Sequence, residues 1–429
     1  MKIKAHHIAS ACGLVVFLAA GIVYQLLPSP IPARLENQAY VWQTRWNDEV
    51  LAAIDRASPV LDGFMLLSGE VDYDGKNFLF SPAYPTPKAG GKPVTMVLRV
   101  KTRFSNALSS GKGIEAKNFL TGLLSPIAQL GATPAPGPRI QIDYDCPTGA
   151  LQDYGGLLKG IRSTFPGAVL SITALPDWLK SVAFSGICAN LDYFVLQVHA
   201  LERPITFDAP YTLCDAEKAR AAVRQAERFG RRFYIALPTY TYRLVFNEKG
   251  TFQTIGAEQS PEFPAVPGQT RDVAADPEKT AGLVREWHVR PPRNCLGLVW
   301  FRLPVDSDRF NLRWPAFEKL LRGETPKFGV TPEIRTPSPG LYELWLVNSG
   351  DYTPAEGLQC MVRWNPTAIL AYDVIGGYRA KPGRDANHIV IHGVAPCENA
   401  QPVLAAWFRV KSEFNNNKDA VQCGPVFAQ

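Results

Sequence analysis

The sequence lacks the short motifs that mark several common classes of protein. No G-x-G-x-x-G or G-x-S-x-G occurs, and Ser110-Gly111-Lys112-Gly113 lacks the spacing of a P-loop. These absences leave dinucleotide binding, serine hydrolysis and P-loop phosphate chemistry without support. No C-x-x-C is present, which excludes zinc-ribbon and thioredoxin-like sites. The six His are scattered, so we predict no metal site and no cofactor.

The chain also has little excess of positive over negative charge. The net charge is +6 over 429 residues and forms no run, so we expect no nucleic-acid partner. Charged residues make up 20% and apolar residues 46% of the chain, which is typical of a globular protein with a sizeable core. The length predicts one large domain and a smaller one.

The N-terminus is predicted to be a targeting segment. Lys2 and Lys4 precede an apolar run from Ile8 to Leu27. A run of about twenty apolar residues is long enough to span a bilayer, and no clean cleavage site follows it. Residues 1–33 therefore form either a cleaved signal peptide or a retained membrane anchor, and we expect the rest of the chain to be exported.

Eight cysteines are present, of which Cys12 lies in the apolar segment. In an exported chain some of the other seven are expected to pair, and an odd number leaves at least one free. Connectivity does not follow from sequence. Cys188–Cys214 and Cys397–Cys423 are the pairs that we consider.

From about residue 38 to 323, short apolar strands alternate with amphipathic helices. Such runs indicate a parallel sheet covered by helices, and eight of them indicate a (β/α)8 TIM barrel, placed at residues 34–325. Segments 71–92 and 240–270 read as hairpin or loop insertions. The predicted barrel strands are Tyr40–Trp46, Gly63–Ser68, Val94–Val100, Ile140–Asp145, Ala168–Ala174, Tyr193–His199, Phe233–Leu237 and Leu296–Arg302.

The pattern changes to strands only after Pro337-Ser338-Pro339-Gly340. We predict a small C-terminal β-sandwich at residues 338–429. Its predicted strands are Leu341–Val347, Gln359–Trp364, Ile369–Val374, His388–His392 and Val403–Val410.

The fourth predicted strand, Ile140–Asp145, carries the most informative residues of the chain. Asp143 and Asp145 are two apart on a strand, so they share a face about 7 Å apart. Active sites of TIM barrels lie at the carboxyl ends of the strands. Two carboxylates at that place indicate acid–base chemistry on an acetal, as in a glycosidase.

Strand Ile140–Asp145 resembles the D-G-x-D-x-D-x-E motif of family 18 glycoside hydrolases, which are chitinase-like. Asp145 takes the place of the final glutamate and Asp143 that of the last aspartate, whereas Gln141 and Pro138 replace the earlier aspartates. Gln197 resembles the glutamine of a further family motif. Trp300 resembles the tryptophan that floors the sugar site.

The resemblance implies catalysis assisted by the substrate, in which the N-acetyl oxygen of the sugar attacks the anomeric carbon. Asp145 would be the acid and Asp143 its partner. Asp is one methylene shorter than Glu, and a shift of about 1 Å in a proton donor costs ~100-fold in rate.

The whole chain also resembles an uncharacterised bacterial domain-of-unknown-function family. The blocks that carry this resemblance are Ile140–Pro147, Ala174–Leu179 and Ala236–Tyr240. The resemblance implies a bacterial origin. An exported bacterial chain is expected in the periplasm, with anchoring to the inner membrane if residues 8–27 are retained.

Further candidates lie at strand ends. Glu70 is the substitute partner for Asp145 in an ordinary two-carboxylate mechanism, and Tyr240, Trp42 and Trp178 are candidate substrate contacts. His199 is interpreted as a packing residue.

The sequence thus predicts a glycoside hydrolase that acts on a cell-envelope or exported polysaccharide. Two rival interpretations remain, a non-catalytic barrel that binds glycan and a structural envelope protein whose sandwich docks a partner. The oligomeric state does not follow from the sequence.

Overall fold

A computed structural model shows the fold of most of the chain. No helix in the described part of the chain is long and apolar enough to cross a bilayer. The predicted targeting segment lies outside this part. The structure describes residues 34–83, 91–130, 137–257, 268–352, 357–383, 387–393, 402–415, 417 and 419–428.

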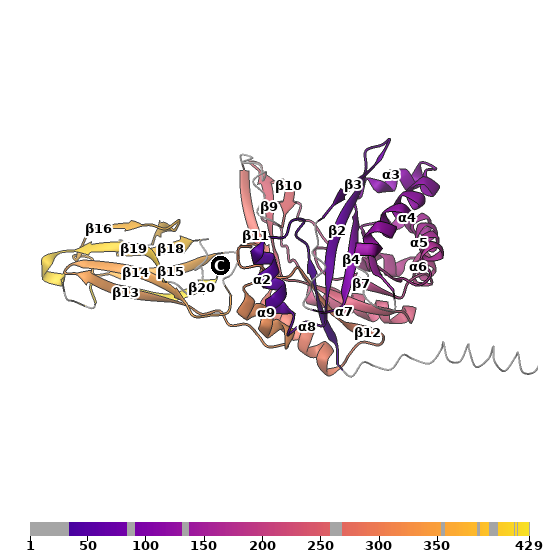
Figure 1. Cartoon of the computed structure of the whole chain (residues 1–429). Helices are drawn as coiled ribbons and strands as arrows, with labels where there is room; N and C mark the ends of the chain where they lie inside the picture. The colour runs from indigo at the N-terminus through magenta and orange to yellow at the C-terminus, as the bar shows by residue number, and fades with distance from the viewer. Residues whose placement is uncertain are drawn as a thin grey trace, which may run out of the picture.

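Eight parallel strands form a closed barrel, which confirms the predicted fold (Figure 1). Each strand pairs with the next, and β1 pairs with both β2 and β12, so no edge remains open. The first strand ends at Val41, earlier than predicted. The barrel strands are β1 (Glu36–Val41), β2 (Gly63–Tyr73), β4 (Val94–Val100), β5 (Arg139–Tyr144), β6 (Val169–Ala174), β7 (Tyr193–Gln197), β8 (Arg232–Pro238) and β12 (Cys295–Phe301).

Helices connect the strands and cover the outside of the barrel. The side chain of Asp215 caps α7 by accepting hydrogen bonds from two backbone N–H groups, and Asp276 caps α8 in the same way. Gly230 ends the turn after α7 at φ 62°, a conformation that favours glycine. The helices are α2 (Asp48–Ala57), α3 (Phe104–Ser109), α4 (Gly113–Leu130), α5 (Leu151–Thr164), α6 (Val182–Cys188), α7 (Ala216–Ala226), α8 (Pro277–Val289) and α9 (Trp314–Leu321).

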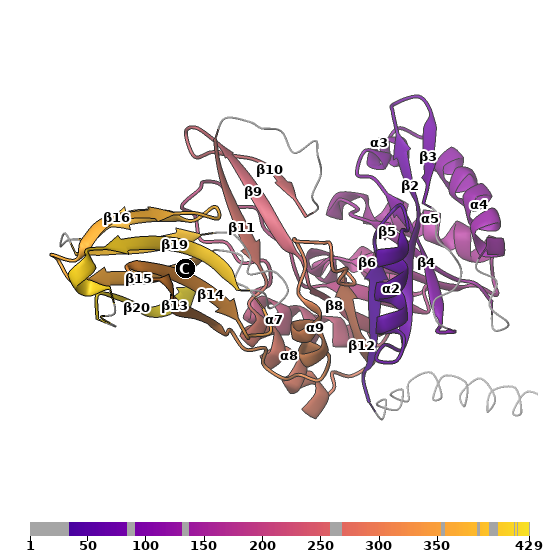
Figure 2. The same cartoon turned by 60° about the vertical axis from the view of Figure 1, so that its left-hand side comes forward.

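Two insertions stand at the same end of the barrel (Figures 1 and 2). Strand β3 (Phe78–Pro82) folds back antiparallel on β2. Strands β9 (Thr241–Asn247), β10 (Phe252–Gly256) and β11 (Gly268–Ala274) form a three-stranded antiparallel sheet. The predicted hairpins are confirmed, and they rise beside the carboxyl ends of the barrel strands.

The C-terminal region consists of two four-stranded antiparallel sheets that share one apolar core, which includes Leu344, Phe408, Val362 and Ile391. Pro339-Gly340 is the turn between β13 and β14, so the antiparallel strands begin before the segment that marks the change of pattern in the sequence. The first sheet contains β13 (Val330–Ser338), β14 (Leu341–Asn348), β19 (Val403–Val410) and β16 (Ile369–Val374). The second contains β17 (Arg379–Pro382), β18 (His388–Gly393), β15 (Leu358–Trp364) and β20 (Val421–Ala428).

The predicted Cys188–Cys214 disulfide is wrong, because both side chains are free thiols. Cys188 ends α6 and Cys214 lies next to β7, where both pack as small apolar side chains in the barrel core. Cys423 is also a free thiol, and its predicted partner Cys397 lies outside the described residues.

Candidate active site

A cavity of about 280 Å³ opens at the carboxyl end of β4 and β5. Val100 and Thr102, on either side of Lys101 in the sequence, are part of its lining. Its charged lining consists of Glu70, Arg99, Lys101, Asp143 and Asp145. The structure thus brings together the three carboxylates that the sequence singles out.

Strand register explains why these side chains meet. Glu70 on β2 lies opposite Arg99 on β4, and Arg99 lies opposite Asp143 on β5. Parallel neighbours at one level point the same way, so an acid, a base and an acid stand side by side. Glu70 pairs with Arg99 at 3.3 Å and with Lys101 at 3.5 Å.

Asp143 is the more enclosed carboxyl of the pair. Thr173 on β6 donates a hydrogen bond of 2.6 Å to its Oδ1. Burial raises the pKa of Asp143 to about 6 and the charge of Asp145 adds to this, whereas Thr173 and Arg99 oppose it. The pair can therefore hold a proton in mildly acidic solution.

Asp145 lies at the mouth of the cavity, two residues beyond Asp143. Its side chain reaches solvent, yet the protein atoms around it remove part of its hydration. This desolvation raises the pKa of Asp145, whereas the positive charges of Arg99 and Arg203 oppose the rise. Asp145 is thus the carboxyl with access to a bound molecule.

Aromatic side chains form a second wall, in a hollow that shares Arg99, Asp143 and Asp145 with the first cavity. The rings of Trp42 and Phe301 are 4.9 Å apart at their centroids. The aromatic lining is Tyr40, Trp42, Tyr240, Tyr242 and Phe301. Such a wall offers apolar faces to a sugar ring.

Gln197, His199 and Tyr240 also line this hollow. Tyr240 is 1% exposed, and its hydroxyl lies 3.1 Å from Nδ1 of His199. Gln197 Nε2 donates to the carbonyl oxygen of His199 at 3.1 Å. Burial lowers the pKa of His199 to about 3, so its ring is neutral near pH 7.

Gln141 lies one inward position below Asp143. It is 0% exposed, and its Oε1 accepts a 2.8 Å hydrogen bond from the hydroxyl of Tyr40. Its Nε2 has no hydrogen-bond partner within the described residues. A neutral amide at this position avoids a buried carboxylate directly below Asp143.

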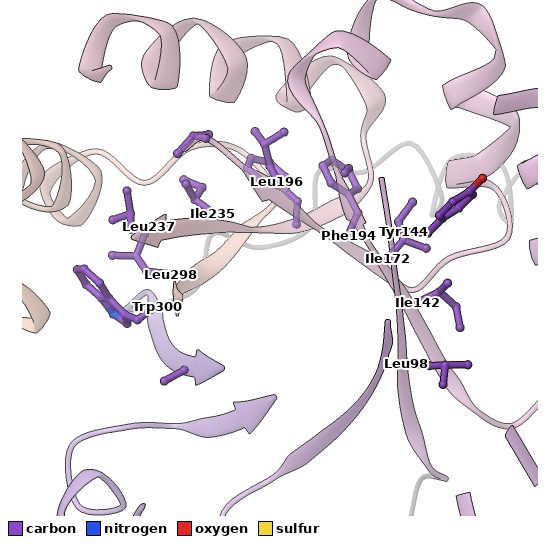
Figure 3. Close-up of a cluster of buried hydrophobic side chains, with 14 of the residues drawn as sticks. Leu98, Ile142, Tyr144, Ile172, Phe194, Leu196, Ile235, Leu237, Leu298 and Trp300 are labelled. Atoms are coloured by element: carbon purple, nitrogen blue, oxygen red, sulfur yellow. The ribbon is translucent and has the colours of Figure 1, made fainter. Parts of the chain in front are cut away.

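Trp300 does not form the floor of the cavity, which corrects the prediction from the sequence. It is 0% exposed, its indole N–H donates to Asn37 Oδ1 at 3.0 Å, and its ring packs on Phe317 of α9. Figure 3 shows it beside Leu298 and Leu237 in the layer under the helices. Side chains alternate along a strand, so the next residue, Phe301, lines the cavity instead.

Trp178 is also absent from the lining of this site. It is 1% exposed, and its indole N–H donates to the carbonyl oxygen of Cys146 at 3.0 Å. Its ring contacts Tyr154 and Phe184 in the core. Trp178 therefore supports the loop after Asp145 and does not face the cavity.

Several lining residues were not singled out from the sequence, among them Arg99, Lys101, Thr173 and Phe301. Strand alternation relative to Asp143 provides a signal for Arg99 and Thr173, but only once the pairing of β4, β5 and β6 is known. Within the described ranges, no group of three or more His, Cys, Asp or Glu side chains is placed to hold a metal ion.

Several solved structures are similar to this chain. The spore cortex-lytic enzyme SleL of Bacillus megaterium QM B1551 is 13% identical, with a TM-score of 0.49 over 69% of this chain and 75% of that chain. A chitinase from Chromobacterium violaceum ATCC 12472 is 11% identical, with a TM-score of 0.48 over 67% and 98%. A family 18 N-acetylglucosaminidase from Paenibacillus barengoltzii is 13% identical, with a TM-score of 0.42 over 67% and 98%.

Comparison with sequence families gives a more specific result. None of the curated protein sequences matches the chain. A family model described as "Domain of unknown function (DUF3142)" matches residues 90–306, which is more than half of the chain and includes β4 to β12. The chain belongs to this DUF3142 family.

Proposed function

We propose that this protein is a glycoside hydrolase that acts on an exported or cell-envelope polysaccharide containing N-acetylhexosamine. The observation that carries the proposal is the pair Asp143–Asp145 in an open cavity, where burial raises the pKa of both carboxyls so that the pair can share a proton. Cleavage of a glycosidic bond needs a carboxyl group that keeps its proton near neutral pH beside one that stabilises positive charge.

In the proposed reaction, Asp145 donates a proton to the glycosidic oxygen as the bond from that oxygen to the anomeric carbon breaks. The acetamido oxygen of the same sugar forms a new bond to the anomeric carbon, which gives an oxazolinium ion. Asp143 orients the acetamido group and stabilises this cation. Water then attacks the anomeric carbon as the bond from that carbon to the acetamido oxygen breaks, and the water returns a proton to Asp145, which restores the acetamido group.

The surrounding residues support this division of roles. Glu70 is paired with both Arg99 and Lys101, so Asp143 is the better partner for Asp145. Trp42 and Phe301 are proposed to contact the apolar face of a sugar, and Gln197 and Tyr240 to line the same site. Export of the chain stays a proposal that rests on residues 8–27 of the sequence.

A non-catalytic glycan-binding barrel is the second candidate. Asp145 stands where the family 18 motif has the longer Glu, and Gln141 stands where that motif has an acid. A barrel that binds without cleaving would tolerate both changes. Docking of a partner by the C-terminal sheets is the third interpretation, and it needs no glycan in the cavity.

Hydrolysis of a panel of N-acetylhexosamine oligosaccharides by the full chain tests the proposal. Product release that both Asp145→Asn and Asp143→Asn abolish would support it. Asp177→Asn is the matched control, because that carboxylate is 79% exposed and does not line the cavity. Saturable binding without any product would instead support the second candidate, and neither binding nor product would support the third.

A further inference from the structure

The cavity contains positive charge that cleavage of a neutral sugar does not require. Arg99 and Lys101 are two apart at the end of β4 and both line the cavity wall. Residues two apart in an extended chain point the same way, about 7 Å from each other. Their side chains are 45% and 44% exposed, so both are accessible to a bound molecule.

One carboxylate serves both cations. Oε1 of Glu70 lies 3.3 Å from Arg99, and Oε2 lies 3.5 Å from Lys101. Strong charge-assisted N–H···O bonds are shorter, about 2.7–2.9 Å. In the part of the chain that the structure describes, neither cation has another carboxylate within ion-pair distance. Donor groups on both side chains are therefore available to a ligand.

Arg203 adds a third positive charge near Asp145. Its side chain is exposed, and its charge acts on both Asp145 and Tyr242. Its neighbour Glu202 pairs with Lys218. No carboxylate of the described ranges forms an ion pair with Arg203.

The charge balance of the site follows from these contacts. Arg99, Lys101 and Arg203 supply three positive charges. Glu70 supplies one negative charge, and the Asp143–Asp145 pair supplies two when both carboxyls are ionised and one when the pair holds a proton. With that one proton on the pair, the site carries one positive charge in excess. Clefts with charge of one sign attract ligands of the opposite sign.

We infer that Arg99 and Lys101 form a subsite for an anionic group, a carboxylate or a phosphate ester, on a sugar bound next to Asp145. The substrate class is then an acidic glycan rather than a neutral one. Glu70 holds the two cations in position until the anion binds. The inference rests on the proposed function only in that the ligand is a glycan.

Affinity measurements on the full chain test this subsite. The background is Asp145→Asn, so that bound ligand is not consumed. The ligands are a neutral N-acetylglucosamine tetrasaccharide, a tetrasaccharide of alternating N-acetylglucosamine and glucuronate, and an N-acetylglucosamine tetrasaccharide with one phosphate ester. We expect an acidic ligand to bind roughly tenfold more tightly than the neutral one, the value of one charge-assisted contact. The acidic ligand that binds more tightly identifies the anion as carboxylate or phosphate.

Variants distinguish binding of the anion at this subsite from a general effect of the positive charge of the protein. Lys101→Gln is expected to reduce the preference for the acidic ligand to within about twofold, and Lys101→Arg to retain it. Arg232→Gln is the control, because this exposed residue lies at the opposite end of the barrel, where β8 begins. High salt is expected to weaken binding of the acidic ligand and to leave the neutral ligand nearly unchanged.

Three results would overturn the inference. Equal affinity for acidic and neutral ligands, or a preference that Lys101→Gln leaves intact, excludes the subsite. Hydrolysis of the neutral oligosaccharide by the parent chain would then leave the proposed function standing. If none of the ligands binds, the inference fails together with glycan recognition by this cavity.

Discussion

The two faces of the barrel strands differ in chemistry. The outer faces, which meet the helices, present Ile142, Leu298 and Trp300, all 0% exposed (Figure 3). The inner faces near the carboxyl ends present Asp143 and Arg99 around a cavity. Ile142 and Asp143 are neighbours on β5, and Trp300 and the cavity-lining Phe301 are neighbours on β12. Because side chains alternate between the two faces of a strand, outward-facing residues contribute to stability and inward-facing residues to ligand chemistry. Substitutions of neighbouring residues are therefore expected to affect different properties: stability for one and binding or activity for the other.

Trp300→Ala is expected to have the largest effect on stability. Its side chain fills the space between β12 and α9, so truncation leaves a cavity and should lower the free energy of unfolding by roughly 3–5 kcal/mol. Urea denaturation measures this change. Trp345→Ala on β14 is the control, because that half-buried indole lies outside the sandwich core and its loss should cost about 1 kcal/mol or less. Similar losses for both variants would contradict the assignment of Trp300 to the core.

Asp143→Asn is expected to change the pH dependence of stability. The folded state raises the pKa of Asp143 from 3.8 to about 6 and so binds its proton more tightly than the unfolded state. The stabilisation of the folded state that comes from this protonated carboxyl is fully present below about pH 4 and is lost as the pH rises through about 6. The parent therefore loses stability as the pH rises, and the variant does not. The free energy of unfolding of the variant, relative to that of the parent, should increase by on the order of 2 kcal/mol between about pH 4 and pH 8.

Chemical denaturation at several pH values checks this expectation, with Asp177→Asn as the exposed control. A difference between variant and parent that stays constant with pH would mean that Asp143 titrates as it does in the unfolded chain. The enclosed inner face would then be ordinary solvent-exposed surface.

Phe301→Leu is expected to affect binding more than folding. The ring lines the cavity beside Trp42 and Tyr240, so its loss removes an aromatic contact with a sugar, worth about 1 kcal/mol or roughly fivefold in affinity. Titration with an N-acetylglucosamine tetrasaccharide measures this effect. Phe328→Leu, a partly buried aromatic of the sandwich core, is the control. Unchanged affinity in the Phe301 variant would contradict the proposal that Phe301 contacts a bound sugar.

Thr173→Val is expected to have the smallest effect. The hydroxyl of Thr173 donates to Asp143 and lowers the pKa of that carboxyl. Valine keeps the shape and removes the donor, so the pKa of Asp143 should rise further above its ordinary value. An NMR titration of the aspartate carboxyl carbons shows the change, with Thr331→Val on β13 as the control. A fall in the pKa would contradict the contact.

The barrel follows from the sequence because its strands are short apolar runs separated by well-capped helices. Asp215 and Asp276, for example, cap α7 and α8. The Asp143–Asp145 face follows from the two-residue period of a strand. The misplacement of Trp300 has the same origin, since every side chain of β12 is apolar and the sequence does not show which alternate set faces inward.

Contacts between strands are harder to predict. The grouping of Glu70, Arg99 and Asp143 depends on the register of β2, β4 and β5, and that register includes a bulge between Leu67 and Gly69. Free thiols at Cys188 and Cys214 depend likewise on tertiary packing. The local sequence pattern specifies neither the register between strands nor the tertiary packing around a cysteine.

The most direct test of the account compares Asp145→Asn with Trp300→Phe in one hydrolysis assay. The ligands are the neutral and acidic N-acetylglucosamine oligosaccharides. We predict that Asp145→Asn lowers product release by roughly 100-fold or more, as expected for loss of a general acid, without lowering stability. Trp300→Phe should lower stability and leave the rate of the folded protein within about twofold of the parent. Full activity in Asp145→Asn would contradict the central claim that the inner face of β5 carries the chemistry.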